Sequence, residues 1–339
     1  LRTRRQRQMC IRDSLSNDIQ KINNLATYSS NGNSIGAITA TVTGTNTEVN
    51  NLSTSDARSD AIAITVEDQT ARNVATSILG KTVNSTIDFS AGGIIGSLNS
   101  GNNNSLTSGG AINTETKNII AHDPDIKIEI NNGSVFSQYA NFKGLATGTV
   151  GVDVGGGNVA THTGILVGTG SSNLSNLSTL NTSATDQISI TISDNDLDAN
   201  DINAINTVAG KTASPVTATI AGSATDLASL NTGSSDVITM NVSGTADYSE
   251  ADALTSKTSA VSNLSFNAIE DTVSALVANG VSNDLLARAT TVTATGNAST
   301  TDGATLAAFD KAIVYSVQDS ASAVSTETSD VDSAISEAA

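Results

Sequence analysis

Hydrophobic and polar residues alternate in several short segments of this chain. The segments "DAIAITV" (60–66), "DQISITI" (186–192) and "DVITMNV" (236–242) place an apolar side chain at every second position. Successive side chains of a strand point to opposite faces, so this period predicts strands with one buried and one Thr-, Ser- and Asn-rich face. The predicted inward residues are Ile62, Ile64 and Val66; Ile188, Ile190 and Ile192; Val216, Ala218 and Ile220; and Ile238, Met240 and Val242.

Short helices are predicted behind these strands. Apolar residues three apart, such as Ile202, Ile205 and Val208, indicate a helical face. Three predicted helix starts fit the capping-box pattern or its Asp variant, namely Thr45 with Glu48, Ser223 with Asp226, and Ser249 with Asp252. Three lysines, each followed by Thr, fall near predicted helix ends, where a cation suits the helix dipole: Lys81, Lys211 and Lys257.

Strand and helix recur together along the chain. "ITATVTGTNTEVNNLST" (38–54) aligns without a gap with "VTATIAGSATDLASLNT" (216–232), and Asp186 lies 50 residues before Asp236. A strand and a short helix cannot bury both faces alone, whereas stacked copies can. We therefore predict a repeat solenoid with half-repeats of about 25 and a full unit of about 50 residues. Its strands, including 60–66, 186–192 and 236–242, are expected in one parallel sheet.

The middle of the chain, residues 92–170, departs from this repeat. It holds 16 of the 27 glycines, and "DIKIEINNGSVFSQY" (125–139) alternates on both sides of Asn132-Gly133, which is a hairpin signature. We predict a Gly-rich region made of strands or an inserted hairpin. The predicted divisions are 15–33 (linker or cap), 34–91 (repeat block), 92–170 (Gly-rich region), 171–317 (repeat block) and 318–339 (acidic Ser/Ala tail or truncated repeat).

The first residues differ in kind from the rest. Residues 4–14, "RRQRQMCIRDS", contain the single cysteine and four of the arginines. A basic arm would bind nucleic acid or an anionic membrane surface. However, back-translation of these eleven residues resembles the transposase adapter that is ligated to fragments in sequencing libraries. We therefore predict that residues 1–14 are adapter-derived, that the natural sequence begins later, and that the chain is a metagenomic fragment.

Charge and composition exclude several classes of function. The net charge is -17, and without residues 1–14, which hold five arginines and Asp13, it becomes -21 with no cysteine left. So acidic a chain repels phosphate backbones and anionic lipids, and we expect no nucleic-acid partner. The absence of cysteine outside residues 1–14 excludes disulfides and thiolate metal sites there. We also expect no membrane span, because no run of 18 apolar residues occurs.

One polar segment is a candidate metal site. "SDNDLDANDI" (193–202) could offer carboxylate oxygens to calcium, although Ala199 and Ile205 stand where an EF-hand loop requires Gly and Glu. The alternative is a strand end followed by a helix capped at Asp198. The candidate ligands are Asp194, Asp196, Asp198 and Asp201. No other cofactor is predicted.

Catalytic motifs are missing. The two histidines, His122 and His162, belong to no H-E-x-x-H pattern, and no G-x-S-x-G motif occurs. We predict solvated loop histidines and no enzyme. The outward pair Thr217 and Thr219, repeated elsewhere, resembles the threonine ranks of ice-binding solenoids, although strand preference alone accounts for most of it.

Composition and repeat style resemble the very large repetitive surface or secreted proteins of bacteria, which are adhesin-like and often calcium-associated. The resemblance covers about 34–91 and 171–317. It implies an extracellular or cell-surface location and a structural or adhesive scaffold. The implied partners are cell-surface glycans or neighbouring repeats of the same long chain. The alternatives are a calcium-, glycan- or ice-binding module and, more remotely, a carbohydrate-active solenoid enzyme.

Overall fold

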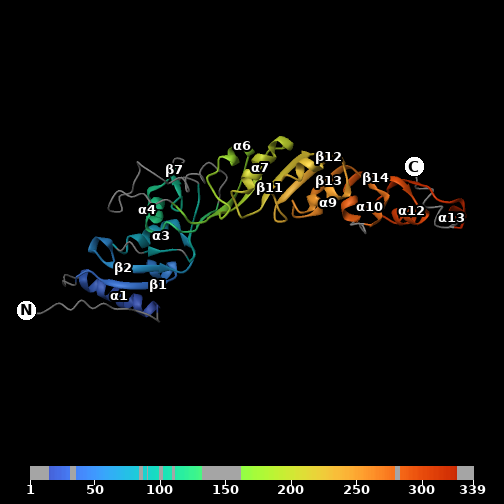
Figure 1. Ribbon diagram of the computed structural model, residues 1–339. Coiled ribbons are helices and arrows are strands. Elements are labelled where there is room, and N and C mark those ends of the chain that lie inside the picture. The colour runs from blue at the N-terminus through green and yellow to red at the C-terminus, as the bar shows by residue number, and fades with distance from the viewer. Residues whose placement is uncertain are drawn as a thin grey trace, which may run out of the picture. The chain divides into compact units, whose positions relative to one another are not determined.

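A computed structural model gives the fold as mixed α/β, with strands and helices alternating along the chain (Figure 1). The structure describes residues 15–30, 36–83, 87–89, 91–98, 102–108, 111–131, 162–278 and 283–326. Residues 1–14, which we expect to be adapter-derived, lie outside this part of the chain.

Most of the strands belong to one sheet. They are β3 (Thr70–Ala71), β5 (Ile94–Gly96), β8 (Ile128–Ile130), β9 (Leu166–Ser172), β10 (Gln187–Ile192), β11 (Val216–Gly222), β12 (Val237–Ala246), β13 (Leu264–Thr272), β14 (Ala289–Ala298) and β15 (Val314–Val317). Three more form a separate sheet: β1 (Thr39–Gly44), β2 (Ala61–Val66) and β4 (Ile87–Asp88). A short antiparallel pair is made by β6 (Thr107–Ser108) and β7 (Ala111–Ile112).

Most of the helices are short. They are α1 (Leu15–Ser30), α2 (Asn46–Asn50), α3 (Arg72–Leu79), α4 (Thr114–His122), α6 (Leu174–Ser178), α7 (Ile202–Ala209), α8 (Ala224–Leu227), α9 (Tyr248–Thr255), α10 (Val273–Ala278), α11 (Asn283–Leu286), α12 (Thr300–Ala307) and α13 (Ala321–Thr326). Single 3-10 turns are η1 (Asp56–Arg58), η2 (Ala199–Asp201) and η3 (Val261–Asn263).

The large sheet has ten strands in the order β15-β14-β13-β12-β11-β10-β9-β8-β5-β3. Its strands pair in parallel, as where Ile220 of β11 lies beside Met240 of β12. Helix α8 packs on β12 and α9 on β13, so each helix covers the strand that follows it. The apolar core therefore lies between the strands and their crossover helices, as parallel pairing requires.

The predicted alternation of the strands is confirmed. All twelve predicted inward residues are buried, and none of them is more than 4% exposed. Their outward neighbours, such as Thr219 and Thr239, are polar and lie side by side across β11 and β12. The alternating pattern predicts these faces correctly because helices cover only one face of each strand, and the apolar side chains lie on that face.

Two of the three predicted helix starts are correct. Thr45 and Glu48 make a full capping box, and the side chain of Ser223 accepts from the backbone amide of Asp226. The start at Ser249 is wrong, because α9 begins two residues earlier with a capping box between Asp247 and Glu250. The earlier start is the one that buries Tyr248, Ala251 and Leu254 along one face of the helix.

The expectation of one common sheet is only partly correct. Strands β10 and β12 share the large sheet, but β2 belongs to the three-stranded one. Strand β2 pairs with β4, whereas β3, which follows β2 in the chain, pairs with β5 in the large sheet. Pairing is thus interrupted at two points, first between β2 and β3 and second between β4 and β5. Gly93, at this second break, has a φ of 71°, and a Cβ there would lie 2.3 Å from the carbonyl oxygen of Lys127. This interruption separates the two sheets.

The Gly-rich middle is not made of strands alone, because α4 lies within it. The predicted hairpin around Asn132-Gly133 is also wrong for its first strand. Strand β8 pairs in parallel with β5 on one side and with β9 on the other, so neither edge is left for a hairpin partner. The second half of that hairpin, like residues 132–161 in general, lies outside the described residues.

The chain divides into two compact units. One comprises residues 1–170 and 179–188, and the other residues 171–178 and 189–339. Residues 15–33, predicted as a linker or cap, contain the long helix α1, which buries Ile19, Ile22 and Ala26. The C-terminal stretch contributes α13, and residues 327–339 lie outside the described part.

Candidate functional site

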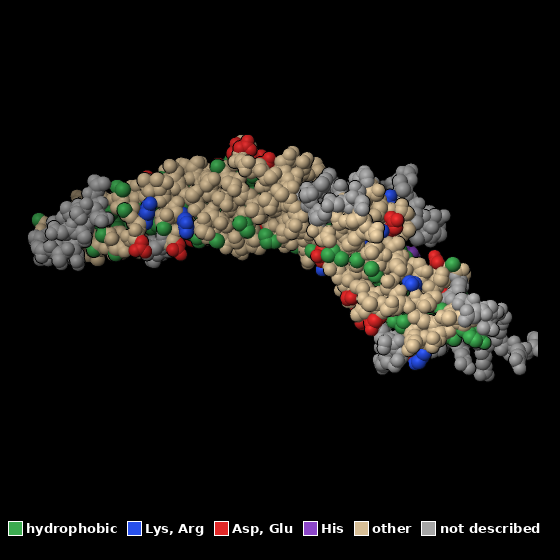
Figure 2. All heavy atoms as spheres, turned by 180° about the vertical axis from the view of Figure 1, so that it is seen from behind, with side chains coloured by type: hydrophobic (Ala, Val, Ile, Leu, Met, Phe, Trp, Pro, Cys, Tyr) green, Lys and Arg blue, Asp and Glu red, His purple; other side chains and the backbone are tan. Residues whose placement is uncertain are grey.

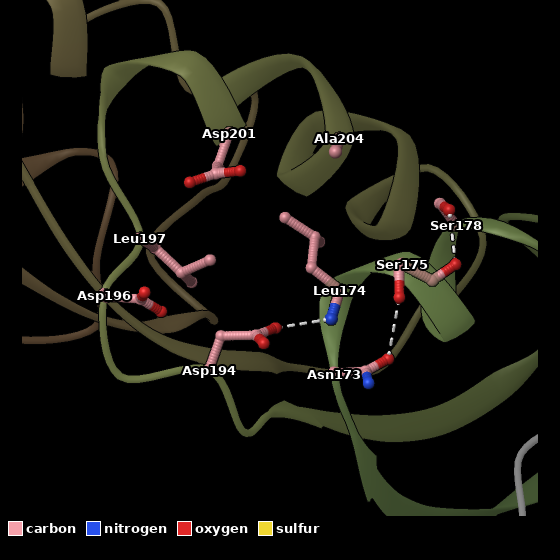
Figure 3. Close-up of a pocket in the computed structure, with 9 residues that line it drawn as sticks. All are labelled: Asn173, Leu174, Ser175, Ser178, Asp194, Asp196, Leu197, Asp201 and Ala204. Atoms are coloured by element: carbon pink, nitrogen blue, oxygen red, sulfur yellow. Dashed lines mark hydrogen bonds between the residues drawn. The ribbon is translucent and has the colours of Figure 1, made fainter.

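The acidic segment after β10 lines a pocket of about 440 Å³ in the second unit (Figure 3). The pocket lies between α6 and the loop that leads from β10 into α7. It is lined by Asn173, Leu174, Ser175, Ser178, Asp194, Asp196, Leu197, Asp201 and Ala204. Three of the four predicted calcium ligands therefore line one pocket, whereas Asp198 does not line it.

Asp194 is occupied by a backbone contact. Its Oδ2 accepts from the amide of Leu174, the first residue of α6, at 2.5 Å. The same contact occurs at three other places. In each, an aspartate in or just after a strand accepts from the amide of the first residue of a helix 19 to 23 residues upstream. The other pairs are Asp68 with Asn46, Asp271 with Tyr248, and Asp319 with Thr300. These contacts satisfy helix amides that have no partner within their own helix.

Asp198 and Asp201 cap the following helix. The side chain of Asp198 accepts from the amide of Asn200 at 2.8 Å, and Asp201 Oδ2 accepts from the amide of Asp198 at 3.0 Å. This reciprocal arrangement is a capping box at η2, directly before α7. The predicted helix cap at Asp198 is thus confirmed.

Asp196 is exposed at the pocket. In the part of the chain that the structure describes, no group of three or more His, Cys, Asp or Glu residues is arranged to hold a metal ion. The structure therefore brings Asp194, Asp196 and Asp201 to one pocket without gathering them into a ligand cluster. Calcium binding here stays a prediction.

A second set of aspartates lies directly before strands, and their side chains are buried. Asp186 Oδ1 accepts from the amide of Leu166, at the start of β9, and its Oδ2 accepts from the amide of Ser183, both at 2.8 Å. Asp60 and Asp236 make the same two contacts. Their donors are Ile38 (3.0 Å) and Ser55 (2.9 Å) for Asp60, and Val216 (2.7 Å) and Gly233 (2.7 Å) for Asp236. Each carboxylate thus joins its own turn to the neighbouring strand.

At the start of other strands a threonine takes this place. Thr82 Oγ1 accepts from the amide of Ile62 at 2.7 Å, and Thr258 Oγ1 accepts from the amide of Ile238 at 3.2 Å. The starts of β1, β9 and β11 are therefore held by Asp, and those of β2 and β12 by Thr. The predicted repeat unit of about 50 residues stays a prediction.

The lysines before these threonines also bridge neighbouring segments. Lys81 Nζ donates to the carbonyl of Leu52, and Lys257 Nζ donates to the carbonyl of Leu230, both at 2.7 Å. The sequence indicated a position near a helix end. It did not indicate which carbonyl accepts from each lysine, because the acceptor lies 27 to 29 residues upstream.

Asp123 is a buried carboxylate with a different environment. Its Oδ2 accepts from the amide of Phe89 at 2.9 Å. Burial raises the pKa of Asp123 above the usual 3.8; the backbone hydrogen bond from Phe89 opposes this rise, and the charges of Asp88 and Asp125 add to it. At the exposed Asp319, by contrast, backbone hydrogen bonds from Thr300 and Ser320 lower the pKa.

His162 does not fit the expectation of a solvated loop histidine. Its side chain is only 2% exposed, and Nε2 lies 2.7 Å from the carbonyl oxygen of Ile126. His122 ends α4 and is half-buried. The local sequence could not show that the His162 ring would lie against a carbonyl 36 residues upstream.

Comparison with known proteins found no relative. No protein family matches the chain, and neither the curated proteins nor the solved structures contain a match. Among the described residues, no helix combines the length and apolar character needed to cross a membrane.

Proposed function

We propose that this chain is a structural or adhesive repeat scaffold of a secreted or cell-surface bacterial protein, built as a solenoid of strand-and-helix coils. The observation that supports this best is the recurring buried carboxylate at Asp60, Asp186 and Asp236. Each bridges two segments about one half-repeat apart with two hydrogen bonds. Hydrogen bonds to a charged group contribute about 1.5–3 kcal/mol each, so these bridges favour a tightly joined stack.

The use of the acidic residues supports the same proposal. Buried Asp186 and half-buried Asp194 bind backbone amides of the preceding coil. On the face shown in Figure 2, acidic side chains lie in small separate groups and most of the visible surface carries no charged side chain. A surface of this kind suits contact with neutral, hydroxyl-rich partners such as glycans, which is the adhesive part of the proposal.

A binding module is the second candidate, because three of the candidate aspartates line one pocket. Calcium would have to compete with the Leu174 amide for Asp194. A glycan would find hydroxyl and amide groups in this pocket, whose lining contains no aromatic residue. Ice binding would use an unbroken outward row of threonines across the strands. That row is interrupted, because Thr217 of β11 lies beside Val237 of β12. A carbohydrate-active enzyme has the least support.

Mechanical unfolding of single molecules tests the scaffold. A coil of 20 to 25 residues has a contour length of about 80 Å, so pulling on the chain ends should give repeated steps of about 80 Å or small multiples of it. A single event that releases each whole unit at once would contradict a stack of separate coils.

Calcium titration followed by thermal melting tests the second candidate. A raised melting temperature at millimolar calcium, lost in Asp196→Asn but kept in the surface control Asp252→Asn, would support the site. An unchanged melting temperature would exclude the calcium role. Binding of the chain to an array of neutral and acidic glycans tests the adhesive part.

A further inference from the structure

The sequence contains one Asp–Pro bond, between Asp123 and Pro124. The bond is trans and follows α4 directly, because the residue before a proline disfavours helical geometry. The carboxyl of an aspartate can reach the carbonyl carbon of the same residue. Beyond that carbon lies the prolyl nitrogen, which is a tertiary amide and more basic than an ordinary peptide nitrogen. An Asp–Pro bond is therefore open to attack by the carboxyl that precedes it.

Two backbone amides hold the carboxyl of Asp123 beside this bond. Its Oδ2 accepts from the amide of Phe89 at 2.9 Å, and the amide of Asp125 also donates to the carboxyl. An aspartate that accepts from the amide two residues further on folds its side chain back along the intervening backbone. That backbone includes the Asp123–Pro124 bond. Because Asp123 is only 9% exposed, its carboxyl is held near the bond and is largely shielded from solvent.

The carbonyl groups on both sides of the bond have donors as well. The carbonyl oxygen of Asp123 accepts from the amide of Ile126 at 3.2 Å. A donor at this oxygen stabilises the negative charge that develops there when the carbon is attacked. The carbonyl of Pro124 accepts from the amides of Thr163 (2.9 Å) and Gly164 (3.2 Å), so the segment beyond the bond is fixed too.

The surroundings of Asp123 favour the protonated carboxyl. Burial raises its pKa, the charges of Asp88 from β4 and of Asp125 add to the rise, and the two backbone hydrogen bonds oppose it. Two histidines border the same loop: His122 ends α4, and the side chain of His162 contacts the loop backbone. The proton matters because the prolyl nitrogen leaves as an amine only after it has accepted one. One carboxyl thus offers both an oxygen nucleophile and a proton.

We propose that the Asp123–Pro124 bond is a self-cleavage site, at which the folded chain hydrolyses its own backbone in mildly acidic solution. A carboxyl oxygen of Asp123 attacks the carbonyl carbon of the same residue, the carboxyl proton passes to the nitrogen of Pro124, and the C–N bond breaks. One fragment then ends in a five-membered anhydride, and the other begins with the secondary amine of Pro124. Water opens the anhydride to two carboxyls, so water is the only other reactant. This site goes beyond the scaffold role and does not depend on it.

Strand pairing crosses the cut. Strand β8 lies after the bond and pairs with β5, which lies before it, as where Ile128 is beside Ile94. The two fragments should therefore stay together after cleavage and separate only on denaturation. Cleavage has to be followed by mass spectrometry or electrophoresis of denatured samples.

The first test compares the folded full chain with the same chain in urea, both at about pH 5, where a carboxyl of raised pKa still holds its proton in part. We expect fragments that end at Asp123 and begin at Pro124. They should form about tenfold or more faster in the folded chain, because the carboxyl is held beside its target. Equal or slower cleavage in the folded chain would overturn the proposal, since it would reflect only the general lability of Asp–Pro bonds.

The pH profile of the cleavage rate gives a second readout. The rate should fall as pH rises through the pKa of Asp123, because the protonated carboxyl is consumed. This fall should be centred above pH 3.8 in the folded chain and near pH 3.8 in urea. Identical profiles in the two states would contradict a role for the folded site.

Variants identify the group that attacks. Asp123→Asn removes both the oxygen nucleophile and the proton, so cleavage should fall by about tenfold or more. The control Asp125→Asn keeps the attacking carboxyl and removes one like charge, so it should still cleave, with its pH profile shifted to lower pH. Cleavage of folded Asp123→Asn at the parent rate would overturn the proposal.

Pro124→Ala stays informative if Asp123→Asn does not fold. It keeps the carboxyl and replaces the tertiary amide nitrogen by an ordinary one, which is a poorer proton acceptor. Cleavage should again fall by about tenfold or more, at a melting temperature that shows a folded chain. An unchanged rate in folded Pro124→Ala would also contradict the proposed mechanism.

Discussion

The region around β10 and the Gly-rich middle place a buried carboxylate in different surroundings. In the turn before β10, the two oxygens of Asp186 each accept from a backbone amide. In the middle, Asp123 accepts from Phe89, and the charges of Asp88 and Asp125 raise its pKa together with burial. A carboxylate with two amide donors therefore stabilises the turn and the strand that it joins, whereas at Asp123 burial and the neighbouring like charges outweigh the backbone hydrogen bonds.

Glycines show the same contrast between the two regions. Gly93 in the middle and Gly244 in β12 both have positive φ, at 71° and 73°. A Cβ at Gly93 would lie 2.3 Å from the carbonyl oxygen of Lys127, whereas a Cβ at Gly244 would have no heavy atom within 4 Å. The middle needs glycine for space as well as conformation, and β12 needs it for conformation only.

The largest effect is expected for Gly93→Ala. It combines left-handed strain with a clash against the backbone just before β8, so we expect a loss of about 4 kcal/mol in unfolding free energy. Gly244→Ala is the matched control, with a loss of about 1 kcal/mol from strain alone. Chemical denaturation of both variants measures the difference. Equal losses would show that the close approach at Gly93 can relax.

Asp186→Asn should have the next largest effect. An amide keeps one acceptor oxygen but turns an NH₂ group toward a backbone amide, so a buried donor loses its partner at a cost of about 2–3 kcal/mol. The exposed Asp252→Asn should change stability by less than about 0.5 kcal/mol. Denaturation midpoints and hydrogen exchange at the Leu166 amide provide the measurement. Protection of that amide at the parent level would argue against the bridge.

Asp123→Asn should have the smallest effect at neutral pH, below about 1 kcal/mol, because the asparagine can still accept from Phe89. Its pH dependence is the sharper measurement. A raised native pKa means that the native state holds the proton more tightly, so this residue favours folding most below pH 3.8 and loses that contribution as pH rises through the raised value. The unfolding free energy of the variant, relative to the parent, should therefore rise with pH in this window. Parallel pH profiles would refute the raised pKa.

Much of the local structure could be predicted from sequence. Strands such as β10 and β12 followed from alternation, because Ile188 and Ile238 begin runs that only a covered sheet face can bury. The capping box at Thr45 and the cap at Asp198 followed from residues that lie within three positions of each other. Such features depend on neighbours along the chain.

Contacts with distant segments were harder to predict than local structure. The Asn132-Gly133 signal predicted a hairpin, but β5 and β9 occupy both edges of β8. The acidic segment after β10 stays a candidate calcium site, but its sequence did not indicate that Asp194 accepts from the amide of Leu174, 20 residues upstream. No local pattern could show which carboxylate would accept a hydrogen bond from a helix amide about 20 residues upstream.

The sequence by itself determined the strand faces, most of the helix starts and the unusual composition of residues 4–14. Only the tertiary structure decided that β2 lies outside the large sheet and that Asp186 and Asp236 bridge neighbouring segments. The physical reason is the range of the interactions. Side-chain alternation and capping act over two to four residues, whereas sheet pairing and carboxylate bridges join groups about 20 residues apart.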